Sequence, residues 1–138
     1  MARSRGPFVL LCVALISFAG CSERELSVYS TIGDARQDGA LARGWLPDYI
    51  PESATNIREF HFVDSSESWT SFECPDECMR ALNTAAKPVD LAPPPRPRDT
   101  RIPWPDHNES LTVRAHHNSD VILIDDTNAH AYVWRRLQ

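Results

Sequence analysis

The sequence lacks the short motifs on which most assignments of enzymatic or nucleotide-binding function depend. It has no Gly-x-Ser-x-Gly segment and no glycine-rich phosphate-binding loop. None of its histidines has a ligand spacing, such as two histidines four positions apart on a helix, so we interpret them as solvated or rim side chains. We therefore expect no catalytic residue, no cofactor and no bound metal. The histidines are His61, His107, His116, His117 and His130.

The sequence also lacks an apolar run long enough to cross a bilayer. Residues 8–20 carry no charge, but they are fewer than the roughly 20 apolar residues that a membrane-spanning helix needs. Arg3 and Arg5 precede them, which is the arrangement of a secretory signal peptide. We expect residues 1–20 to be this signal and exclude them from the reasoning about the fold.

The signal ends in Phe18-Ala19-Gly20-Cys21, which resembles the bacterial lipobox. In that motif the cysteine is lipidated and becomes the first mature residue, although Leu is usual where this chain has Phe18. The resemblance implies acyl chains such as palmitate on Cys21, and several chains make the anchor effectively stable. Ser22 resembles an outer-membrane sorting address, which implies a domain facing the periplasm. The alternative is an ordinary cleaved signal with a coincidental cysteine.

Basic residues are scarce relative to acidic ones. Removing Arg3 and Arg5 from the 14 basic residues leaves 12 against 19 acidic ones, a formal charge of −7 for the mature chain. Phosphate backbones and anionic lipid head groups repel such a domain. We therefore expect no nucleic-acid partner, and a membrane contact made through the lipid on Cys21. The tether, residues 21–25, reaches at most about 18 Å.

Beyond the lipidation site, only Cys74 and Cys78 remain. Nearby thiols usually pair outside the cytoplasm. Four positions apart at the start of a helix, their α-carbons can fall within the window of about 4.4–6.8 Å that a disulfide needs. We predict a structural disulfide. The alternatives are half of a metal site or a redox pair. A redox pair normally has two intervening residues, whereas Cys74 and Cys78 have three between them.

The apolar patterning predicts a single α+β domain over residues 26–138, with a mostly antiparallel sheet of five or six strands and two short helices. We expect the first helix from Ile32 to about Gln37, with Thr31 as its cap; Gly39 weakens any continuation and Gly44 ends it. The second helix begins at Cys74-Pro75 and ends at Lys87-Pro88, with Cys78, Leu82, Ala85 and Ala86 on its buried stripe. The strand-like runs are 26–30, 57–63, 68–73, 111–115, 121–124 and 129–135; the second and third form a hairpin, and the last three form a meander.

Residues 88–105 contain seven prolines. Such a stretch favours extended polyproline geometry and cannot join a central strand. We interpret it as a surface connector whose end is held to the core by Trp104. The alternative is a docking strap for a partner, with Arg96 and Arg98 among its exposed residues.

The segment from Gly44 to Thr55 forms a corner rich in aromatic residues and prolines. Trp45 and Tyr49 are four positions apart, so they share one face of a single apolar turn, which Pro51 stops. The segment is similar to one in small uncharacterised bacterial lipoproteins that share a GWLPxxIPxSAxxI pattern, a resemblance that implies no catalytic residue. We expect Trp45 and Tyr49 to pack in the core. The alternative is that they contact a partner, as Arg96, Arg98 and Trp104 could.

These features favour a membrane-anchored lipoprotein of the cell envelope, acting as a non-enzymatic interaction or structural module with an envelope-protein partner. A small hydrolase-like envelope enzyme, or a lipoprotein that binds a small ligand or a metal, is the alternative. Enzymes generally need a polar cluster within a concavity. The residues that stand out here are apolar anchors and turns instead.

Overall fold

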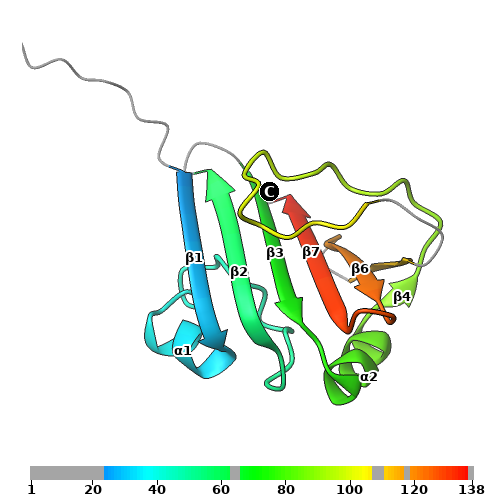
Figure 1. Ribbon diagram of the computed structural model, residues 1–138, viewed down its shortest axis with the longest axis horizontal. Coiled ribbons are helices and arrows are strands. Elements are labelled where there is room, and N and C mark those ends of the chain that lie inside the picture. The colour runs from blue at the N-terminus through cyan, green and yellow to red at the C-terminus, as the bar shows by residue number, and fades with distance from the viewer. Residues whose placement is uncertain (1–23, 63–65, 107–110, 117–118, 137–138) are drawn as a thin grey trace, which may run out of the picture.

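The computed structural model describes residues 24–62, 66–106, 111–116 and 119–136. The signal peptide, Cys21 and residues 63–65, between the second and third predicted strands, lie outside these residues. Within them, seven strands form one sheet, accompanied by two helices (Figure 1). In chain order the elements are β1 (Arg24–Thr31), α1 (Ile32–Gln37), β2 (Thr55–Phe62), β3 (Glu67–Glu73), α2 (Asp76–Ala85), β4 (Lys87–Pro88), β5 (Thr112–Ala115), β6 (Val121–Asp125) and β7 (His130–Arg136).

The strands lie in the order β1-β2-β3-β7-β6-β5-β4, and every neighbouring pair is antiparallel. The α+β class, the pairing of β2 with β3 and the meander with β6 at its centre are thereby confirmed. The predicted count of five or six strands is wrong, because β4 adds a seventh. Pro88 has no amide hydrogen to donate, so this two-residue strand can pair only at the edge of the sheet.

The first helix begins and ends at residues whose local chemistry favours a boundary. Thr31 Oγ1 accepts a hydrogen bond from the Asp34 amide, and the Asp34 carboxylate accepts one from the Thr31 amide, which together form a capping box. Gly39 adopts a positive φ of 81° just beyond the helix, so it ends α1 rather than weakening a longer helix. Residues 40–45 make a further turn that closes at Gly44, whose φ is 73°.

A disulfide joins the start of α2 to the end of β3. Cys74 and Cys78 are bonded, with their α-carbons 5.1 Å apart, as predicted. Pro75 occupies the cap position, and no side chain of the described residues caps this helix. Leu82 is buried as expected, whereas Ala85 is exposed. In the described part of the chain, no helix has the length and apolar character needed to span a bilayer.

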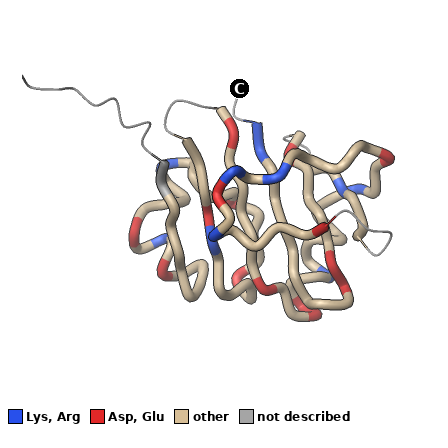
Figure 2. The backbone as a smooth tube through the Cα atoms, turned by 45° about the horizontal axis from the view of Figure 1, so that its top comes forward, with Lys and Arg blue, Asp and Glu red and all other residues tan. Residues whose placement is uncertain are grey.

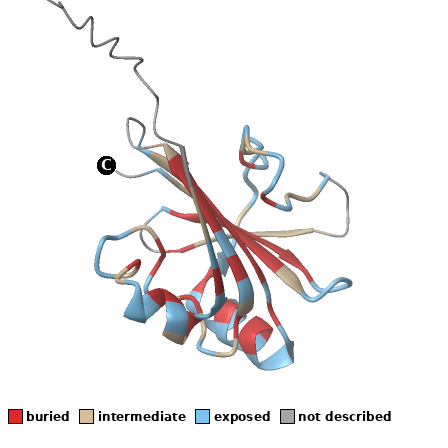
Figure 3. Ribbon diagram, turned by 60° about the vertical axis from the view of Figure 1, so that its left-hand side comes forward, coloured by how far each residue is buried: buried red, intermediate tan, exposed pale blue. Residues whose placement is uncertain are grey.

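Each face of the sheet has its own apolar cluster. The helices lie on one face, where Ile57, Phe72 and Val133 belong to the larger cluster (Figure 3). The connector lies on the other face and crosses β2, β3 and β7 (Figure 1), where Phe60 and Trp69 pack with residues of the connector. The two faces are called the helix face and the connector face below.

Two hydrogen bonds from the sheet hold the connector in place. Trp69 Nε1 donates to the carbonyl of Pro95 at 2.9 Å, and Arg58 Nη1 donates to the carbonyl of Arg101 at 3.1 Å. Trp104 packs against the cluster of the connector face, as expected. The proline-rich segment is therefore fixed along the sheet rather than extended into solvent.

Candidate functional site

A shallow groove of about 470 Å³ follows the outer edge of β1. Among the described residues β1 pairs with β2 alone, so its other edge has no partner strand. Both β1 and the turn that follows α1 contribute to the groove. Its lining consists of Ser27, Val28, Tyr29, Asp38, Arg43 and Trp45.

The polar side chains of the groove bond to one another. The Tyr29 hydroxyl donates to Asp38 Oδ2 at 2.8 Å, and Arg43 Nη2 donates to the same oxygen at 2.7 Å. These two bonds stabilise the carboxylate, so the pKa of Asp38 lies below its ordinary value. Burial raises the pKa of Tyr29. The groove therefore presents a paired acid and base rather than an unpaired charge.

Trp45 connects this groove to the helix face of the sheet. The guanidinium carbon of Arg43 lies 3.8 Å from the centroid of the Trp45 ring, within the range of a cation–π contact. The same ring lies 4.9 Å from the imidazole of His61 on β2. Trp45 is half-buried and packs against the larger apolar cluster. It is thus both a packing residue and part of an open surface.

A buried acid–base pair lies next to Trp45. Glu59 is fully buried, and His61 Nδ1 lies 2.9 Å and 3.1 Å from its two carboxylate oxygens. A carboxylate that orients an imidazole supplies two of the three members of a nucleophilic triad. Ser68 lies opposite His61 in the pairing of β2 with β3, but its Oγ is buried and makes no hydrogen bond within the described part of the chain. The pair therefore does not activate Ser68 in this arrangement.

The interpretation of the histidines as solvated or rim residues is wrong for two of them. His61 and His116 are buried, whereas His130 is half-buried; His107 and His117 lie outside the described residues. In the described ranges, no three or more His, Cys, Asp or Glu side chains gather in a group that could hold a metal ion.

Tyr49 attaches the same corner to the C-terminal third of the chain. Its hydroxyl donates to Asp120 Oδ2 at 2.9 Å, and its ring stacks on His116 at 3.9 Å between centroids. Arg135 Nε lies 3.3 Å from the same Asp120 oxygen, and Arg135 Nη1 donates to the carbonyl of Gly44 at 2.9 Å. Burial, and then the charge of Asp120, raise the pKa of Tyr49. The corner is therefore held by polar contacts as well as by apolar packing.

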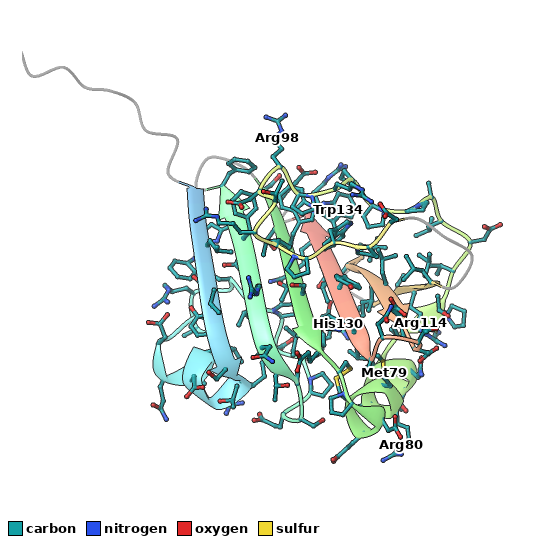
Figure 4. All side chains as sticks on the ribbon, in the orientation of Figure 1. Met79, Arg80, Arg98, Arg114, His130 and Trp134 are labelled. Atoms are coloured by element: carbon teal, nitrogen blue, oxygen red, sulfur yellow. A yellow bond between two sulfur atoms is a disulfide. The ribbon has the colours of Figure 1, made fainter. Side chains whose placement is uncertain are left out.

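The three predicted partner-binding residues of the connector lie on the opposite face. Trp104 makes an edge contact with Tyr132, with centroids 5.5 Å apart. Arg96 pairs with Asp106 and so closes the connector into a loop. Arg98 is exposed, extends away from the domain (Figure 4), and has no ion-pair partner among the described residues. Arg96, Arg98 and Trp104 therefore do not share a surface with Trp45 and Tyr49.

Sequence reasoning missed most of the groove. Tyr29 was expected only as part of a strand, and Asp38 and Arg43 belong to a turn with no recognisable motif. The sequence offered one signal for the groove. Arg43 lies two residues before Trp45, in the segment that follows Gly39. Basic residues are scattered among acidic ones over the described backbone (Figure 2). The absence of a nucleic-acid partner remains a prediction.

Residues 25–73 match the family model of the YbbD head domain. The similar stretch runs from β1 to β3, includes the whole groove, and amounts to about a third of the chain. The connector and the C-terminal meander lie outside it. No curated protein and no solved structure gives a significant match to this chain.

Proposed function

We propose that the protein is a lipid-anchored module of the bacterial cell envelope that binds a partner protein through the groove beside β1. The observation that carries this proposal is the composition of the groove, where a paired Asp38 and Arg43 lie beside a half-exposed Trp45. Aromatic and arginine side chains are enriched at protein interfaces. A groove whose acid and base are already paired to each other is suited to recognition rather than to proton transfer.

The anchor in this proposal is the lipid on Cys21, added after removal of residues 1–20. Ser22 then directs the protein to the outer membrane, with the domain facing the periplasm. Strand β1 begins at Arg24, three residues after Cys21, so its start lies within about 10 Å of the lipid attachment. The groove along β1 would therefore be presented close to the membrane surface.

The mass of the protein extracted from native envelopes tests the anchor. We expect a chain that begins at Cys21 and carries acyl groups, and a Cys21→Ser variant that is released from the membrane fraction. A mature chain without acyl groups would remove the anchor from the proposal.

Crosslinking in native envelopes tests the groove. Arg43→Gln removes both the basic partner of Asp38 and the cation beside Trp45, and we expect it to lower the yield of the crosslinked complex at least tenfold. Arg36→Gln is the matched control, because Arg36 is also exposed and pairs with Glu52 outside the groove. Equal yields from the two variants would show that the groove is not the binding surface.

A further inference from the structure

The two edges of the sheet differ in their protection against pairing with another strand. At one edge, β4 consists of only Lys87 and Pro88, and short strands, lysine and proline all discourage further pairing. At the other edge, β1 has eight residues, of which residues 26–30 include neither a charge nor a proline. An edge of this kind offers its backbone N–H and C=O groups to an additional strand.

We infer that β1 accepts an extended, uncharged segment of a partner protein, which pairs with it as an additional strand. This inference rests on the proposed function and specifies how the partner binds. Val28, on the connector face, is 58% exposed, so an apolar side chain on the added strand would cover it. On the helix face the added strand meets Asp38 and Arg43, which already pair with each other. A charged side chain there would lose hydration without gaining a free partner.

A second copy of the chain fits this edge less well than a different protein does. Two copies joined by a two-fold axis would pair their β1 strands antiparallel, which separates the two Arg24 residues by about 23 Å along the strands. With both copies anchored in one leaflet through Cys21, the sheets would have to lie flat on the membrane. An acidic domain is repelled by anionic head groups in that position. A strand from a different protein imposes no such orientation.

Amide hydrogen exchange of the lipidated protein in detergent tests the pairing directly. The probe is an acetylated and amidated hexapeptide of alternating threonine and valine, and the control peptide has lysine in place of each valine. We expect the first peptide to slow exchange at least tenfold at every second amide of residues 24–30, because only alternate amides face outward. The lysine peptide should leave exchange unchanged. Unchanged exchange with both peptides, or dimerisation of the protein without peptide, would overturn the inference.

Substitutions at two exposed apolar residues separate this inference from the proposed function. Val28→Lys places a charge on the free edge, whereas Leu91→Lys makes the same change at a residue of the connector that is 50% exposed. We expect Val28→Lys to reduce the crosslinked complex at least tenfold, and Leu91→Lys to keep it within twofold. If Arg43→Gln loses the complex and Val28→Lys keeps it, strand addition is rejected, while binding through the groove is retained. The absence of any complex with the unaltered protein would reject the proposed function.

Discussion

The hydroxyl of Tyr49 donates a hydrogen bond of 2.9 Å to Oδ2 of Asp120, across 71 positions of sequence. Asp120 is buried, and Arg135 approaches the same oxygen from β7. The bond joins the corner that carries Trp45 to the turn that precedes β6. The open groove beside β1 therefore depends on contacts made by the last third of the chain.

Replacing Tyr49 with Phe should destabilise the protein by about 1–3 kcal/mol, because it leaves a buried carboxylate without one of its donors. Tyr29→Phe is the matched control, since Tyr29 also donates to an aspartate, Asp38. The side chain of Asp38, however, is 55% exposed. Water can replace the lost donor there, so the loss should be clearly smaller. Urea denaturation of both variants measures the difference, and equal losses would contradict it.

The tyrosines also predict a loss of stability in alkaline solution. Burial raises the pKa of Tyr49, and that of Tyr132, above the ordinary value of 10.0. Above pH 10 the unfolded chain therefore releases protons that the folded chain retains, and the free energy of unfolding falls as the pH rises. Each such tyrosine contributes at most about 1.4 kcal/mol per pH unit, and its contribution is intact below pH 10. Denaturation at pH 8 to 11.5 should show a shallower decline in Tyr49→Phe than in the unaltered protein; identical slopes would refute the assignment.

Glu59→Ala should cost about 3–5 kcal/mol, because it removes the carboxylate that pairs with His61 in a buried site. The control is Glu52→Ala, whose carboxylate is 71% exposed and pairs with Arg36. Exposed ion pairs contribute less than about 1 kcal/mol, so this variant should remain close to the unaltered protein. Thermal unfolding of the two variants makes the comparison. A small effect of Glu59→Ala would show that the pair is not a structural contact.

Local chemistry allowed much of the fold to be predicted from the sequence. The cap at Thr31, the disulfide between Cys74 and Cys78 and the central strand at 121–124 each depend on residues close together in the chain. Short spacing and alternating apolar residues carry this information directly. The seventh strand was missed because two residues, one of them proline, give no periodicity.

The candidate site could not be predicted in the same way. The pairing of Asp38 with Tyr29 and Arg43 depends on how the turn after α1 folds back against β1. Glu59 is buried beside His61, whose ring contacts Trp45 in the corner that Arg135 holds from the other end of the chain. A polar residue in a strand is expected to face solvent, and only tertiary packing places Glu59 on a covered face.

Removing the disulfide should destabilise the protein by about 2 kcal/mol, because the bond closes a short loop and so restricts the unfolded chain only modestly. The test is the double variant Cys74→Ala/Cys78→Ala, measured by urea denaturation with and without a reducing agent. The reducing agent should lower the midpoint of the unaltered protein toward that of the variant and leave the variant unchanged. A midpoint of the unaltered protein that does not respond to reduction would contradict this prediction.

The hydrogen bond from Trp69 Nε1 to the carbonyl of Pro95 should determine how firmly the connector is held on the sheet. Trp69→Phe removes this donor, so trypsin should cleave after Arg98 and Arg101 several-fold faster, because cleavage requires local release of the chain. Trp104→Phe is the matched control, since Trp104 Nε1 is buried but makes no hydrogen bond to any described residue. Mass spectrometry of the fragments gives both rates. Equal acceleration in the two variants would show that aromatic packing, rather than this bond, holds the connector.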